Sequence, residues 1–187
     1  MFETGTPHTG PEVRLALEQL VGEGVEYMAS FSDETFFRPQ GAAWSPAGHI
    51  RHLRRASSPL VVAFRLPRLL LGFRFGWRRI PSVSFAQLRD RYQAALAQGG
   101  QAGAFSPGPE PPPPDPAARR QEILSRWEAV TRNLAARATP WSEPALDRYQ
   151  LPHPLLGALS LREMLCFTVY HTAHHLRRVA ERAGGTP

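Results

Sequence analysis

Apolar side chains recur every three to four residues along four long stretches of the chain, the spacing that places them on one face of an α-helix. These stretches, with one shorter segment, predict helices over residues 11–30, 46–66, 84–97, 116–138 and 160–184. Four of the helix starts carry residues that favour N-caps: Ser45, Ser84, Asp115 and Ser160. No stretch shows a convincing strand pattern. The sequence therefore predicts an all-α fold, a four-helix bundle with one short extra helix.

The segments between the predicted helices differ in character. Residues 1–10 are expected to form a loose lead-in, and residues 35–43 and 68–81 to form loops. The segment 106–116 contains seven prolines in eleven residues, which excludes a helix or a central strand and predicts a proline-rich connecting loop on the surface. No internal repeat divides the chain, so a single domain is expected over residues 1–187.

The predicted last helix carries the clearest candidate chemistry. At 100° per residue, its inward face collects eight residues: Leu161, Met164, Leu165, Thr168, His171, Thr172, His175 and Val179. His171 and His175 are one turn apart on this face, so their imidazoles can share a metal ion. His174 points away from the face and is expected beside the site or at the surface. Ser160 and Glu163 have the spacing of a capping box, so we interpret Glu163 as a cap rather than a catalytic carboxylate.

A third ligand is expected from the predicted second helix, which offers His49 and His52. His49 lies at the edge of the inward face of that helix, and His52 lies further round. His52 shares its side of the helix with small apolar residues that could line a cavity: Ala56, Pro59 and Ala63. Periodicity leaves the choice open, with a slight preference for His49. His153 stands between two prolines in a predicted turn over 151–157, where it is expected to bond the backbone.

The amino-acid composition limits which kinds of metal site and which cellular locations are possible. Hydrophobic residues make up 42% of the chain and charged residues 20%, which is ordinary for a globular protein. Cys166 is the single cysteine, which excludes an internal disulfide and a site of several thiolates, so a metal would be held by nitrogen and oxygen. Cys166 faces away from the histidine pair and is expected to be a buried or interface thiol. No secretory signal or membrane-length apolar stretch is apparent, which favours a cytoplasmic protein without a membrane partner.

The charge distribution is uneven. All 22 basic residues are arginines, the formal net charge is +6, and ten arginines but no acidic residue lie between Glu34 and Asp90. A region with one sign of charge can attract an anion, such as a carboxylate, a phosphate or a nucleic acid. A solvated basic surface is an equally good interpretation. Because the chain lacks a helix-turn-helix or zinc-finger pattern, nucleic-acid binding is kept only as a minor alternative.

Two sequence elements follow each other in a characteristic order. The first is Trp44-Ser45-Pro46 with His49-Ile50-Arg51-His52-Leu53, and the second is His153-Pro154 with Tyr170-His171-Thr172-Ala173-His174-His175. In this order and separation they resemble the DinB-like superfamily of four-helix-bundle proteins. The resemblance implies a divalent metal ion, often zinc or nickel. Carried over residue by residue, it assigns the metal ligands to His52, His171 and His175, and so replaces the preference for His49.

The resemblance also implies an activity. Characterised relatives include bacillithiol S-transferases and mycothiol-dependent maleylpyruvate isomerase, which use low-molecular-weight thiols. We therefore expect a metal-dependent transferase or isomerase that uses a thiol such as bacillithiol on a small anionic substrate, with a role in stress responses. Three imidazoles would leave a fourth metal position for water or substrate. Arginines of the second helix and the loop after it are expected to receive the anionic groups.

Some features depart from this picture or leave it incomplete. Arg178 stands three residues after the last ligand, where relatives often have glutamine, so the surroundings of the ligands differ. No general base is evident, and Tyr149 and Tyr170 are candidate acids. The alternative function is a non-catalytic protein of the same fold that binds a metal or small ligand. Bundles of this kind often pair through helix faces, so a homodimer is compatible with the sequence.

Overall fold

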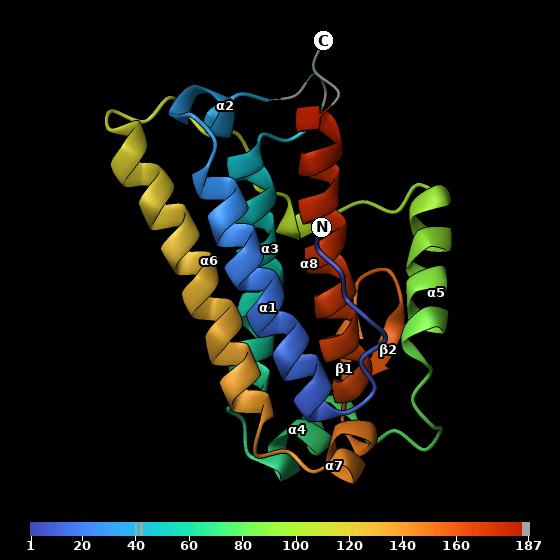
Figure 1. Ribbon diagram of the computed structural model, residues 1–187. Coiled ribbons are helices and arrows are strands. Elements are labelled where there is room, and N and C mark those ends of the chain that lie inside the picture. The colour runs from blue at the N-terminus through green and yellow to red at the C-terminus, as the bar shows by residue number, and fades with distance from the viewer. Residues whose placement is uncertain (40, 42, 185–187) are drawn as a thin grey trace.

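The computed structural model describes residues 1–39, 41 and 43–184 (Figure 1). Its elements, in chain order, are α1 (Gly10–Ala29), α2 (Asp33–Phe37), α3 (Pro46–Ala63), α4 (Arg68–Phe75), α5 (Phe85–Ala97), a 3₁₀ turn (Gly103–Phe105), α6 (Pro116–Ala138), α7 (Glu143–Arg148), β1 (Gln150–His153), β2 (Gly157–Ser160) and α8 (Leu161–Gly184). The five predicted helices correspond to α1, α3, α5, α6 and α8.

Helices α1, α3, α6 and α8 form a four-helix bundle in which each helix packs against two others (Figure 1). Helix α5 lies outside the bundle and packs along α8, and the antiparallel hairpin β1–β2 also contacts α8. Helices α4 and α7 lie at one end of the bundle and α2 at the other. The predicted bundle with one short extra helix is therefore confirmed, and the hairpin is an addition to it.

Helix α8 is enclosed on nearly every side. Every residue from Leu161 to Ala173 is buried, because α1, α3, α5, α7 and the hairpin all pack against this helix. The inward face predicted from the sequence is buried throughout. The other faces of the first turns are buried as well, so their polar groups need hydrogen-bond partners inside the protein.

The start of α8 shows how these needs are met. The Glu163 amide donates a hydrogen bond to Ser160 Oγ at 3.0 Å, and the Ser160 amide donates to Glu163 Oε2 at 2.8 Å, which is the predicted capping box. Glu163 Oε1 also accepts from the Arg78 guanidinium and the Val83 amide. The N-caps predicted for three other helices form too: Ser45, Ser84 and Asp115. Glu163 is thus occupied in holding the backbone, as its interpretation as a cap predicts.

The prediction of a loop over residues 68–81 is wrong for the first half of this segment, because residues 68–75 form helix α4. Helix α4 has eight residues, of which only Leu71 and Gly72 are buried, and so short a stretch has too few positions to show a helical period clearly. Helix α3 continues through Pro59 and ends at Ala63, and the chain then bends by 115° into α4. By length and composition alone, α3 and α4 together could form a bent membrane-spanning segment. No single helix of the described residues is long and apolar enough to cross a membrane.

The sequence also missed the strands and two short helices. Residues 151–157, predicted as a tight turn, belong to the hairpin, whose four-residue strands are too short to show a period of two. Helix α7 has six residues and α2 has five, and both depend on contacts with neighbouring elements. Within the loop predicted over 35–43, Gln40 and Ala42 lie outside the described residues.

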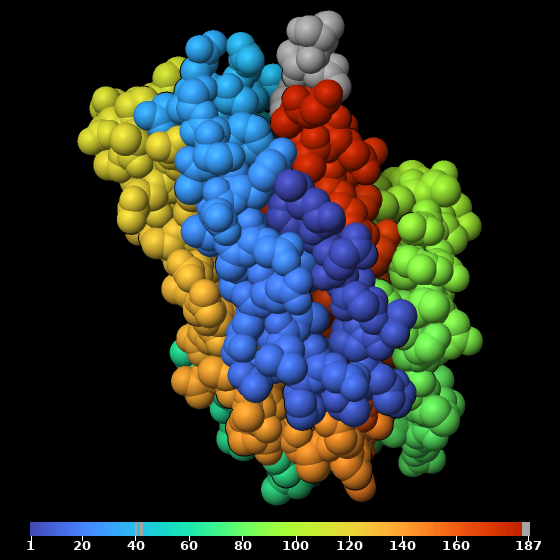
Figure 2. All heavy atoms as spheres, viewed as in Figure 1, coloured from blue at the N-terminus to red at the C-terminus, as the bar shows by residue number. Residues whose placement is uncertain are grey.

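The N-terminal segment 1–9 is irregular, but it is not the loose lead-in that the sequence predicted. Phe2 is only 1% exposed and packs edge-on against Tyr27 of α1. The Pro7 carbonyl accepts a hydrogen bond from Cys166 Sγ at 3.6 Å, so the single thiol is buried under this segment. Figure 2 shows the segment lying between α1 and α5. Tertiary contacts with α1 and α8 therefore order residues that have no secondary structure of their own.

Arg162 joins the N-terminal segment to two helices. Its side chain, on the first turn of α8, donates to the His8 carbonyl at 2.5 Å and to Glu143 Oε2 at 2.5 Å. It also donates to both carboxylate oxygens of Asp147, at 2.6 and 2.9 Å. These bonds hold the pKa of Asp147 below its usual value. One guanidinium therefore links α8, α7 and the start of the chain.

Replacing Arg162 with methionine should lower the free energy of unfolding by about 2–4 kcal/mol, because a buried cation is lost together with its hydrogen bonds to Asp147, Glu143 and the His8 carbonyl. Urea denaturation measures this change. Release of the N-terminal segment should also uncover Cys166, so the thiol should react faster with a disulfide reagent.

A matched control is Arg132→Met, which removes an exposed i,i+4 pair with Glu128 on α6. Its cost should be below about 1 kcal/mol, with no change in thiol reactivity. Equal destabilisation by the two substitutions would show that the Arg162 cluster does not have the role assigned to it.

Candidate metal centre

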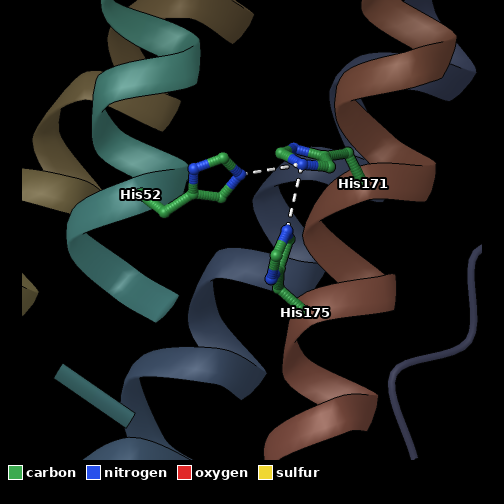
Figure 3. A group of neighbouring side chains, drawn as sticks. All are labelled: His52, His171 and His175. Atoms are coloured by element: carbon green, nitrogen blue, oxygen red, sulfur yellow. Dashed lines mark hydrogen bonds between the residues drawn. The ribbon is translucent and has the colours of Figure 1, made fainter. Parts of the chain in front are cut away.

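Helices α3 and α8 bring three histidines together in the interior of the bundle (Figure 3). His52 comes from α3, and His171 and His175 come from successive turns of α8. The Nε2 atom of His171 is 3.0 Å from His52 Nε2 and 3.1 Å from His175 Nε2. All three rings are buried, and their facing nitrogen atoms lie within 4.8 Å of one another. The sequence-predicted residues therefore form one compact cluster, which we call the histidine triad.

His52 is oriented by a backbone carbonyl from a distant part of the chain. Its Nδ1–H donates to the Phe105 carbonyl at 2.9 Å, which leaves the lone pair on Nε2, toward the other two rings. The two residues that follow Phe105 are bound to α3. Arg51 donates to the Pro107 carbonyl at 2.9 Å and Arg55 donates to the Ser106 carbonyl at 2.5 Å, so these bonds hold Phe105 against the helix. The proline-rich segment thus contributes to the site, a role that the sequence did not reveal.

His49 lies beside the triad but is not part of it. Its Nδ1 atom is 2.8 Å from His175 Nδ1, on the side of the His175 ring away from His171. The slight preference that helical periodicity gave to His49 is therefore not supported by the geometry. His49 instead contacts the outer nitrogen of His175, where it can accept a hydrogen bond and so leave the His175 Nε2 lone pair free.

The environment keeps the imidazoles neutral at ordinary pH. Burial lowers the pKa of His52, opposed by its bond to the Phe105 carbonyl, and burial lowers the pKa of His171 and His175 well below 6.5. Burial, with the nearby charge of Arg182, lowers the pKa of His49 to about 3. Neutral imidazoles are the form that binds metals, because a proton and a metal ion compete for the same lone pair.

The triad fits a divalent metal ion of intermediate hardness. Two ligands of a tetrahedral zinc ion are roughly 3.3 Å apart, given Zn–N bonds of about 2.0–2.1 Å. The observed spacings of 3.0 and 3.1 Å are close to this value. Three imidazoles and no thiolate also suit zinc or nickel better than magnesium or calcium, which prefer oxygen ligands. With three protein ligands, one coordination position would remain open.

The triad lines a cavity of about 590 Å³. Its walls are mainly apolar and aromatic, including Trp44, Phe105 and Phe167. Ala56 and Pro59 of the small apolar strip on α3 line it as predicted. Among the described residues that line the cavity, no side chain is acidic, and Arg178 and Arg182 are the basic ones apart from histidines. A small substrate can therefore reach the triad in a site that is largely apolar and carries positive charge.

Two further histidines that the sequence singled out, His174 and His153, line the cavity. His174 lines the cavity and its ring lies near those of Tyr92 and Tyr170, so it is beside the site as expected. His153 also lines the cavity, and its Nδ1 accepts from the amides of Leu155 and Leu156, which is the predicted backbone role.

Two candidates belong to the scaffold. Tyr149 is in an isolated bridge with Trp77 and does not line the cavity. Burial raises the pKa of the Cys166 thiol to about 12, and its bond to the Pro7 carbonyl lies on the other side of α8. Neither residue can act on a ligand bound at the triad.

Comparisons with known proteins identify the fold and the family of the chain. No curated protein shows significant sequence similarity to the chain. One solved structure, YfiT from Bacillus subtilis, is described as a probable metal-dependent hydrolase with an unusual four-helix bundle topology. It is 15% identical, the match covers 97% of this chain and 90% of YfiT, and the TM-score is 0.61, so the two share a fold. The model of the DinB superfamily matches residues 16–179, which contain the whole triad. The chain therefore belongs to the DinB superfamily.

Proposed function

We propose that this protein is a metal-dependent transferase or isomerase that uses a low-molecular-weight thiol, and that His52, His171 and His175 bind its metal ion, zinc or nickel. One observation carries the proposal: three neutral imidazoles point their Nε2 atoms at one another in the wall of a cavity large enough for a small substrate. A bound ion would supply a Lewis acid and a position for a thiolate or a substrate oxygen.

The lining of the cavity favours transfer over hydrolysis. Metal-dependent hydrolases of the H-E-x-x-H type place a carboxylate beside the metal as a general base for water. The described lining residues include no carboxylate, and Glu163 is fully engaged as a helix cap. A thiol would lose its proton to solvent on binding a metal ion as the thiolate, so the attacking sulfur would require no such base. Hydrolysis is the second candidate, supported by the description of YfiT, whose fold this chain shares.

Nucleic-acid binding has less support than the sequence suggested. Several arginines of the region between Glu34 and Asp90 form ion pairs with acidic residues from outside it. Arg51 pairs with Glu110 and Arg78 pairs with Glu163, both with side chains that are mostly buried. These pairs reduce the single-signed charge that motivated the idea. We therefore retain a non-catalytic metal-binding protein as the main rival and nucleic-acid binding as a minor one.

Metal binding is the first property to test. We expect purified wild-type protein to hold about one zinc or nickel ion per chain, and His52→Ala or His171→Ala to abolish stoichiometric binding, because two imidazoles make an incomplete site. His49→Leu should retain the ion with an affinity about 10–100-fold lower, since it removes the hydrogen-bond partner of a ligand. Plasma mass spectrometry gives the content and competition with a chelator gives the affinity.

The matched control is His174→Gln, which alters a histidine on the same helix outside the triad and should leave metal content unchanged. Retention of metal by His52→Ala together with its loss in His49→Leu would make His49 the ligand. A wild-type protein that takes up neither ion would reduce the triad to buried structural residues.

Acid should destabilise the metal-free protein. The pKa of His49 is about 3 in the folded protein, mainly because of burial, against 6.5 when unperturbed. Between these values the unfolded chain binds more protons, so the free energy of unfolding falls as pH falls through this window. His49 alone should contribute about 1.4 kcal/mol per pH unit below pH 6.5. His52, His171 and His175 act in the same direction because burial lowers their pKa as well.

Urea denaturation at pH 7.5, 6.5 and 5.5 measures this dependence. The free energy of unfolding of His49→Gln should fall less steeply as pH decreases, because the variant lacks one of the buried histidines that take up protons on unfolding. An identical acid sensitivity in the variant would mean that His49 is not held neutral in the folded state.

Catalysis is tested by turnover with a thiol. Zinc- or nickel-loaded protein should accelerate the attack of bacillithiol on an electrophile such as monochlorobimane, in which the sulfur–carbon bond forms as chloride leaves. The acceleration should disappear in His171→Ala and persist in His174→Gln. Hydrolysis of activated esters without thiol dependence would favour the hydrolase, and metal binding without any turnover would favour the binding protein.

A further inference from the structure

One irregular connection of the chain forms part of the cavity wall. We call residues 98–115, which join α5 to α6, the strap (Figure 1). Three residues of the strap line the cavity: Gln101, Ala102 and Phe105. The Phe105 carbonyl also accepts the hydrogen bond from His52 Nδ1 at 2.9 Å. The strap therefore closes one wall of the cavity and contacts a histidine of the triad.

Burial of apolar side chains holds the strap only weakly. Its regular structure is limited to the 3₁₀ turn Gly103–Phe105. The structure describes every residue of the strap, and among these only Pro107 is buried. A segment with so few buried contacts opens more readily than the helices around it. The position of the strap therefore depends on its polar contacts with the bundle.

Arginines of α3 supply some of these contacts. Arg51 donates to the Pro107 carbonyl and Arg55 donates to the Ser106 carbonyl, at 2.9 and 2.5 Å. The sequence predicted that arginines of this helix receive an anionic group of the substrate, but neither of these two lines the cavity. Instead they bind the backbone of the strap directly after Phe105.

Glu110 fastens the strap to two helices of the bundle at once. One of its carboxylate oxygens pairs with Arg51 Nη1 of α3, and the other accepts a hydrogen bond from Arg119 Nε of α6 at 2.9 Å. The side chains of Glu110 and Arg51 are only 13% and 17% exposed, so solvent and salt screen this pair less than a surface pair. Loss of the carboxylate would leave Arg51 as a mostly buried cation without its counter-charge.

These contacts form a continuous path from Glu110 through Arg51 and the strap backbone to the Phe105 carbonyl and His52. We propose that Glu110 is a positioning residue of the metal site, because it keeps the strap closed and so holds the Phe105 carbonyl at His52 Nδ1. With the hydrogen of the ring fixed on Nδ1, the Nε2 lone pair of His52 is available to a metal ion. Closure of the strap and metal binding are then coupled, and each strengthens the other.

The inference rests on the proposed function, and zinc affinity tests it without measuring turnover. Glu110→Gln keeps the size of the side chain and removes its charge. The dissociation constant for zinc should rise about 3–10-fold, less than the roughly 10–100-fold expected for loss of a direct hydrogen-bond partner of a ligand, because Glu110 acts through Arg51 and the strap. Competition with a chelator measures this constant.

Hydrogen exchange of the strap measures the coupling in the opposite direction. Zinc should slow amide exchange at residues 98–106 of the wild-type protein by at least the factor by which Glu110→Gln weakens zinc binding, since the two effects are linked. Exchange in α4, which does not line the cavity, should stay the same and serves as the internal reference. This comparison needs no substitution, so it tests the coupling even where a variant is unstable.

The matched control is Glu122→Gln. Glu122 shares the partner Arg119, at 2.6 Å, and also pairs with Arg126, at 2.7 Å, but both of these ion pairs lie within α6. The same change of charge should therefore leave zinc affinity and strap exchange at their wild-type values. Glu110→Asp, which keeps the charge on a side chain one methylene shorter, should recover part of the affinity.

Three results would overturn the positioning role. The first is an unchanged zinc affinity in Glu110→Gln. The second is an equal loss of affinity in Glu122→Gln, which would reflect general charge rather than the strap. The third is a wild-type strap that exchanges at the same rate with and without zinc, because a purely structural Glu110 would leave the strap insensitive to the metal.

Failure of the proposed function gives a different result, because metal content is measured on every sample first. A wild-type protein that binds neither zinc nor nickel would refute the metal site and the coupling together. Zinc binding by the wild type with the same affinity in Glu110→Gln would refute the coupling alone and leave the metal site in place.

Discussion

The burial of four imidazole rings between α3 and α8 is the constraint on which the rest of the site depends. Each ring has two nitrogen atoms, and inside a protein each nitrogen must be placed as a donor or an acceptor. The Phe105 carbonyl decides this for His52, and His49 can decide it for His175. These outer contacts leave the Nε2 lone pairs of both rings directed at His171. The capacity of the triad to hold a metal ion therefore depends on the groups behind the rings as much as on the rings themselves.

Irregular parts of the chain supply much of that support. The proline-rich segment has no helix or strand between Ser106 and Pro114, yet the carbonyls at its start are bound by Arg51 and Arg55 of α3. These bonds hold the preceding turn, and with it the Phe105 carbonyl, against His52. On the other side of α8, the N-terminal segment is held by Arg162 and covers Cys166. The helix that carries two histidines of the triad is thus supported from opposite sides.

The arginines serve two separate purposes. Those that are concentrated between Glu34 and Asp90 in the sequence partly act as structural cations, as the Arg78–Glu163 and Arg51–Glu110 pairs show. The arginines that line the cavity lie more than eighty residues later, at the end of α8. A run of like charges along the chain therefore says little about the field at the site, because the field depends on which charges folding brings together and which it pairs.

The sequence by itself determined the bundle helices, several caps and the pairing of His171 with His175. These follow from a period of 3.6 residues and from interactions within three or four positions, which are local properties of the chain. It could not decide between His49 and His52 from periodicity, and the family resemblance was needed to favour His52. It also missed α4, α7, the hairpin and the ordered N-terminal segment, whose positions depend on contacts with distant residues. Only the tertiary structure decided that the carbonyl of Phe105 faces His52, that His49 stands behind His175, and that Arg178 and Arg182 share a cavity with the triad. The physical reason is that each of these contacts joins residues on different elements or different turns, and their geometry is set by how the bundle packs.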